Sequence, residues 1–137
     1  MAKWQQVVMF EIKKASEAEI AERNDLAGKV AQALARAGFS VHRDVNQPAA
    51  ALGALVWADP AEGSEGGVFV QWLIDPSLSR AAAESAQKGE VQAPAFRHFG
   101  FVTEHMCATL IAILGSAGFR AGDADDDMSP FLIRVEG

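Results

Sequence analysis

The chain has 137 residues, of which 50% are hydrophobic and 22% are charged, and its formal net charge at pH 7 is -6. This length fits one globular domain, residues 1–137, with a single core, and the composition excludes a disordered chain. The negative charge disfavours nucleic acid as a partner, because it repels a phosphate backbone.

The N-terminal stretch has an apolar run of only four residues before Glu11. That run is shorter than a signal-peptide core and far shorter than the roughly 20 residues of a membrane span. We therefore expect a cytoplasmic protein with no membrane partner. The single cysteine, Cys107, cannot form an internal disulfide, which agrees with a reducing compartment.

The first clear element is a helix that starts near Ser16. Ser16 and Glu19 have capping-box spacing, and apolar residues recur at helical intervals as far as Ala37. Asn24 and Asp25 offer a second start, so the pattern also fits two shorter helices. Gly38 is a typical helix stop, and the letters AGF that surround it recur at residues 117–119. A repeat of three letters is better explained by two similar helix-to-strand junctions than by duplication of a segment.

The middle and the end of the chain predict strands and two more helices. Strands are expected at 39–45, at 53–59 and within 66–75, the last of these central because both of its faces are apolar. A short helix from Pro76 to Gln87, a loop at 88–96 and a strong helix from Val102 to Ala117 follow. A strand near Phe119, an acidic turn and a last strand at 130–135 end the chain.

These elements predict an α+β fold, in which a mainly antiparallel twisted sheet of about five strands packs against helices. Residues 4–15 fit either a strand or a helix. A strand would give a ferredoxin-like layout, and a helix would give a layout like that of secretion-chaperone dimers. Both comparisons concern the fold alone.

The segment from Arg97 to Leu114 gathers two histidines, a glutamate and the cysteine. Helical spacing places Cys107 in the core stripe and His105 on another face with Thr109, Ala112 and Ser116. This small-residue face suits contact with a helix or a second subunit. His98 lies about 10 Å from His105 along a helix, too far to share a metal ion, and Gly100 argues against a helix that reaches it. We expect no metal site.

The acidic turn holds Asp123, Asp125 and Asp127 at the alternate spacing of calcium loops. An EF-hand would require glycine at Met128 and glutamate at Arg134, so the turn is better explained as solvated, or as a contact for a basic partner. The sequence also lacks a phosphate-binding glycine loop and a serine nucleophile elbow. We therefore expect no cofactor and no catalytic residue.

The first functional hypothesis is a non-enzymatic protein interaction module, of adaptor, chaperone-like or inhibitor-like type, that acts as a homodimer. The residues expected to make contacts are Trp72, Phe69, His105, Thr109, Ser116, Asp123, Asp125 and Asp127. The alternative is an enzyme or ligand-binding domain with a pocket between sheet and helices, lined by Arg97, His98, Glu104 and His105. A third hypothesis is an acidic decoy of a nucleic-acid-binding protein.

Overall fold

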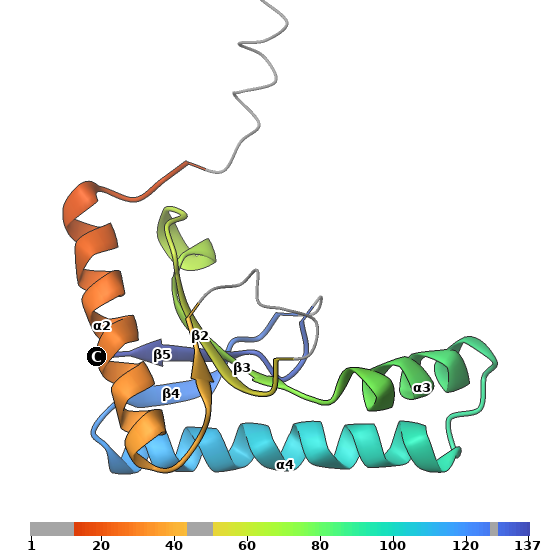
Figure 1. Cartoon of the computed structure of the whole chain (residues 1–137). Coiled ribbons are helices and arrows are strands. Elements are labelled where there is room, and N and C mark those ends of the chain that lie inside the picture. The colour runs from red at the N-terminus through yellow and green to blue at the C-terminus, as the bar shows by residue number, and fades with distance from the viewer. Residues whose placement is uncertain (1–12, 44–50, 127–128) are drawn as a thin grey trace, which may run out of the picture.

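A computed structural model of the chain describes residues 13–43, 51–126 and 129–137, and these form an α+β fold with a five-stranded sheet (Figure 1). The elements in chain order are α2 (Glu17–Arg36), β1 (Val41–His42), β2 (Gly53–Asp59), the 3-10 helix η1 (Gly63–Glu65), β3 (Gly67–Leu73), α3 (Pro76–Gln87), α4 (Pro94–Ser116), β4 (Arg120–Asp123) and β5 (Ile133–Glu136). The predicted fold class is confirmed.

The strands lie in the order β1-β2-β3-β5-β4, and all pairs are antiparallel except β1 with β2. The central position predicted for β3 is correct, since β3 pairs with β2 on one side and β5 on the other. β4 is an edge strand, and it lies beside α4.

Helix α2 begins where the sequence predicted. The Ser16 side chain accepts a hydrogen bond from the Glu19 backbone N–H at 3.2 Å. The helix is continuous through Asn24 and Asp25, so the alternative of two shorter helices is wrong. Packing of its inner face against the sheet outweighs the low helix propensity of these two residues. Most of the ambiguous stretch 4–15 lies outside the described residues.

Helix α4 is longer than predicted. It begins at Pro94 and includes Arg97, His98 and Gly100, so the prediction of a loop reaching residue 96 and an irregular entry segment is wrong. Proline fits the first turn of a helix, and one interior glycine costs only about 1 kcal/mol. Helix α3 packs alongside this half of α4, and both extend beyond the sheet (Figure 1).

Helices α2 and α4 share one pattern, offset by 80 residues. The buried residues Ala27, Val30 and Leu34 of α2 correspond to Cys107, Leu110 and Leu114 of α4. Both helices end in the same hydrogen-bonded cap. In each, a phenylalanine N–H, from Phe39 or Phe119, donates to the carbonyl of the buried leucine at 3.0 to 3.1 Å. The similarity therefore extends well beyond the three repeated letters.

The core lies between these two helices and one face of the sheet. It includes the inward residues of β2, β3 and β5, which are Ala54, Val56, Val68, Val70, Ile133 and Val135. The opposite sheet face carries Trp57 stacked on Phe69, with ring centroids 5.6 Å apart. Because β2 and β3 are antiparallel, Trp57 pairs with Phe69 and Trp72 pairs with Ala54.

Candidate interaction surface

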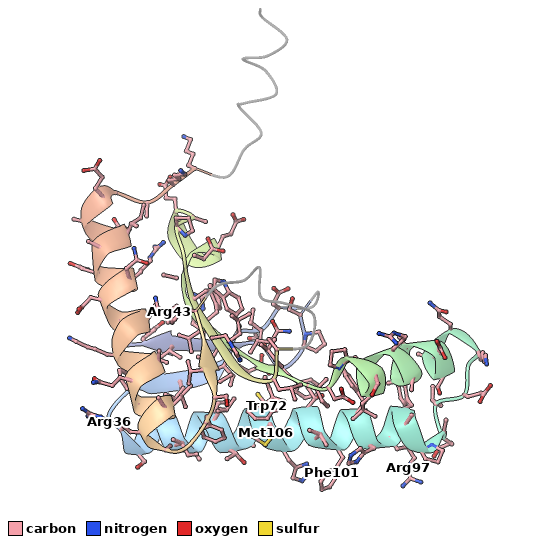
Figure 2. All side chains as sticks on the ribbon, in the orientation of Figure 1. Arg36, Arg43, Trp72, Arg97, Phe101 and Met106 are labelled. Atoms are coloured by element: carbon pink, nitrogen blue, oxygen red, sulfur yellow. The ribbon has the colours of Figure 1, made fainter. Side chains whose placement is uncertain are left out.

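The outward side of α4 is the most unusual surface of the described residues. We call five of its exposed residues the outer face: Phe101, His105, Ala108, Ala112 and Gly115. They recur at intervals of four, three, four and three, the spacing of a helix-helix contact seam. The Phe101 side chain is 59% exposed and points away from the sheet (Figure 2).

Helix α4 is apolar far beyond what its buried side requires. Among its 23 residues, only Arg97 and Glu104 belong to the Asp, Glu, Lys and Arg group. Helix α4 is the one helix in the described part of the chain that is long and apolar enough to cross a membrane, by length and composition alone. Only 17% of its most apolar 18-residue stretch is buried. Much of its apolar surface therefore faces outward.

The polar groups of this face are largely satisfied within the helix itself. The His105 ring stacks on Phe101 with centroids 3.8 Å apart, and its Nδ1 lies 2.8 Å from the Phe101 carbonyl oxygen. Thr109 Oγ1 donates to the His105 carbonyl at 2.8 Å. A partner that covered this face would leave few polar atoms unpaired.

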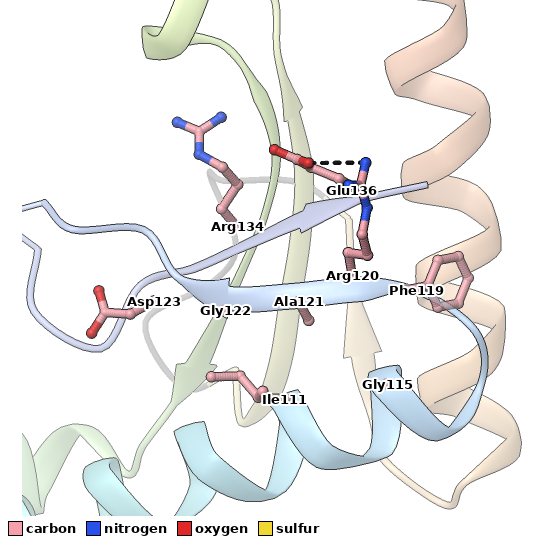
Figure 3. A pocket seen from close by; sticks show the side chains of 9 residues that line it. All are labelled: Ile111, Gly115, Phe119, Arg120, Ala121, Gly122, Asp123, Arg134 and Glu136. Atoms are coloured by element: carbon pink, nitrogen blue, oxygen red, sulfur yellow. Dashed lines mark ion pairs between the residues drawn. The ribbon is translucent and has the colours of Figure 1, made fainter.

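A groove of about 510 Å³ lies beside the C-terminal half of α4, at the edge strand β4 (Figure 3). Its lining residues are Ile111, Gly115, Phe119, Arg120, Ala121, Gly122, Asp123, Arg134 and Glu136. The α4 side is apolar, while an ion pair of 3.2 Å joins Arg120 and Glu136 across the neighbouring strands. A side chain at Gly115 would meet open space, since no heavy atom lies within 4 Å of a Cβ built there.

The residues proposed for a ligand pocket all lie on the first half of α4. Arg97, His98, Glu104 and His105 are all exposed, and none lines the β4 groove or a second groove beside α2. Across residues 13–43, 51–126 and 129–137, no three His, Cys, Asp or Glu side chains gather closely enough to hold a metal ion.

Cys107 belongs to the core, as its helical position predicted. Its side chain is buried, burial raises the pKa of its thiol, and the Asp123 carboxylate raises that pKa further. A thiol that stays protonated is a poor nucleophile. The residue therefore contributes to packing.

The other predicted contact residues are dispersed. Trp72 packs against Phe39 on the helix-covered face of the sheet, with centroids 5.9 Å apart, while Phe69 is nearly buried on the opposite face. Asp123 ends β4, and its carboxylate accepts the Asp125 backbone N–H at 2.7 Å. Asp127 lies outside the described residues. Thus His105, Thr109 and Ser116 share one exposed side of α4. Trp72 and the acidic turn lie elsewhere on the molecule.

Phe101, Ala108 and Gly115 were not among the residues predicted to make contacts. Their alternating intervals of four and three are visible in the sequence, but the predicted helix began at Val102 and so excluded Phe101 from the seam. A comparison of the chain with protein-family models, with curated proteins and with solved structures found no match.

Proposed function

We propose that this protein is a non-enzymatic protein interaction module that acts as a homodimer and uses the outer face of α4 as its contact surface. One observation supports the proposal above all: a long apolar helix contributes Leu110 and Leu114 to the core while its opposite side remains exposed. Exposed apolar surface of this kind marks an interaction site, because covering it releases the water that it orders.

The packing of α4 favours a protein over a lipid bilayer as the material that covers it. Leu110 and Leu114 are fully buried against the sheet, so a helix that moved into a membrane would uncover the core. Burying each of these side chains stabilises the fold by about 2 kcal/mol. A partner that docks on the outer face leaves this packing intact.

The test combines sedimentation of the full chain across micromolar to submillimolar concentrations with a tagged pull-down from the source cell. We expect a mass above that of the monomer or a captured protein, either of which is lost in Phe101→Ser. The control is Leu52→Ser, which removes another exposed apolar side chain, 49% exposed and distant in sequence from α4.

A monomeric chain that captures no partner would overturn the proposal. So would loss of association in both variants alike, since the contact would then not depend on α4. Binding of the chain to liposomes, abolished by Phe101→Ser alone, would instead identify a lipid surface as what covers α4.

A further inference from the structure

The outer face of α4 is bulky at one end and hollow at the other. Phe101 projects from its N-terminal half and is 59% exposed. The β4 groove lies at its C-terminal half, where Gly115 leaves open space between Ile111 and Phe119. The two features lie about 21 Å apart along the helix, at a rise of about 1.5 Å per residue.

We propose that two copies of the chain pair through antiparallel α4 helices, and that Phe101 of each copy enters the Gly115 groove of the other. This inference rests on the proposed homodimer. A two-fold axis near Ala108 places each bulky end opposite a hollow end, so the same contact forms twice. The intervals of four and three allow side chains of one helix to fill gaps of the other.

The antiparallel direction follows from shape. A parallel pair would place Phe101 against Phe101 and Gly115 against Gly115, so that two rings hold the helices apart at one end and a void remains at the other. In the antiparallel pair the phenyl ring meets Ile111 and Phe119, both of which line the groove. Filling a void with an aromatic ring recovers apolar burial and dispersion contacts.

The electrostatics also favour this face for contact between identical chains. Two chains that each carry a formal charge of -6 repel one another. The outer face holds no Asp, Glu, Lys or Arg, whereas α2 holds seven such residues among 20. Contact through α4 keeps like charges apart.

The available area agrees with a dimer only when the phenyl rings are inserted. A helix of 23 residues is about 35 Å long and about 12 Å wide, which offers roughly 400 Å² per copy. The strip already includes the exposed part of Phe101, so each inserted ring adds only the groove walls that it covers, on the order of 100 Å². The total of roughly 1,000 Å² fits a weak dimer, whereas the helices alone would fall below this size.

The experiment uses engineered cysteines in a Cys107→Ser background of the full chain. The double variant Glu104→Cys with Ala112→Cys keeps Phe101 and Gly115, and both substituted residues are exposed. It should form a disulfide-linked dimer under mild oxidation, because the two positions are equidistant from Ala108 and each thiol faces its counterpart in the other copy. The same two residues within one chain are about 12 Å apart and too distant to bond. Glu104→Cys alone and Ala112→Cys alone are the controls, and neither should form the dimer efficiently.

A second measurement fills the groove without introducing a thiol. Gly115→Leu should raise the dimer dissociation constant about tenfold or more by sedimentation, with an unchanged circular dichroism spectrum. Ala35→Leu is the matched control, because Ala35 occupies the corresponding exposed position of α2. It should leave the dissociation constant unchanged.

The outcomes separate this pairing from the broader function. Cross-linking of Glu104→Cys alone, or a wild-type dimer whose double variant does not cross-link, overturns the antiparallel pairing while the interaction module stands. A monomeric chain that captures a partner through Phe101 likewise overturns only the pairing. A monomeric chain without a partner overturns both.

Discussion

Helices α2 and α4 pack against the sheet through matching buried residues, but their exposed sides differ in character. Their three buried positions match at an offset of 80 residues, and their C-terminal caps use the same hydrogen bonds. On the outside, Asp25 and Lys29 of α2 form an ion pair of 3.1 Å. The matching positions of α4 hold His105 and Thr109.

The difference separates the positions that the fold requires to be apolar from those that it leaves free to vary. A buried side chain every three or four residues and a glycine cap are sufficient to attach either helix to the sheet. The outer positions are free of this requirement. On α2 they carry charges that water solvates, whereas on α4 they are apolar and small, which suits a protein contact.

The largest effects should come from the shared inner pattern. Leu34→Ala and Leu114→Ala each remove a fully buried side chain next to a cap, and each should lower the free energy of unfolding by about 2–5 kcal/mol. Urea denaturation measures both, with the exposed Leu52→Ala as a control that should cost little. A loss at one leucine only would show that the two helices are not anchored alike.

The next effect should separate the two outer faces. Ala112→Glu places a carboxylate on the proposed α4 seam, where the antiparallel pairing sets it opposite the exposed Glu104 of the other copy. It should weaken self-association by about 2 kcal/mol or more, since like charges then meet in the interface. Gln32→Glu makes the same change at the matching position of α2 and should leave association unchanged. Sedimentation equilibrium measures both. Equal effects of the two substitutions would contradict the assignment of the contact to α4.

A smaller effect is expected at the two caps. Gly38 and Gly118 have φ values of 105° and 98°, and a Cβ on either would touch nothing within 4 Å. Gly38→Ala and Gly118→Ala should therefore each cost about 1 kcal/mol, from backbone conformation alone. In the interior of α2, Gly28→Ala should instead stabilise the fold. Thermal unfolding at matched protein concentration tests the three, and unequal costs at the caps would show that their hydrogen bonds differ in strength.

The smallest effect concerns the N-termini. Ser16 caps α2 with its side chain, while Ala93 at the start of α4 has the same extended backbone and no side-chain hydrogen bond. Ser16→Ala should cost about 1 kcal/mol, and Ala93→Ser should gain about 0.5 kcal/mol. Chemical denaturation provides both values. No gain at Ala93 would indicate that solvent already satisfies this end of α4 as well as a serine does.

Local signals predicted much of the fold. Helix α3 matches its predicted range, and strand β2 matches the apolar run 53–59. Proline at the start of α3 and glycine at the start of β2 mark these boundaries directly. Residues 94–101 of α4 were missed, because Gly100 and the bulky residues around it disfavour a helix locally, while packing against α3 supports one there.

The candidate site was predictable only in part. His105, Thr109 and Ser116 fell on one side of a helix by spacing alone, and they are exposed there. Phe101 could not be joined to them, because the predicted helix began at Val102, one residue after it. Trp72 and Phe69 are only three residues apart, yet β3 turns them to opposite faces of the sheet.

The sequence by itself determined the fold class, the core positions of both long helices and their stops, because these depend on periodicity and on residues with restricted backbone preferences. Tertiary structure decided which apolar residues stay uncovered. A helix pattern gives the angle of each side chain around its axis, but not whether another element packs there. Only the arrangement of α4 under the sheet, with β4 at the edge, left Phe101 exposed and Gly115 beside a groove.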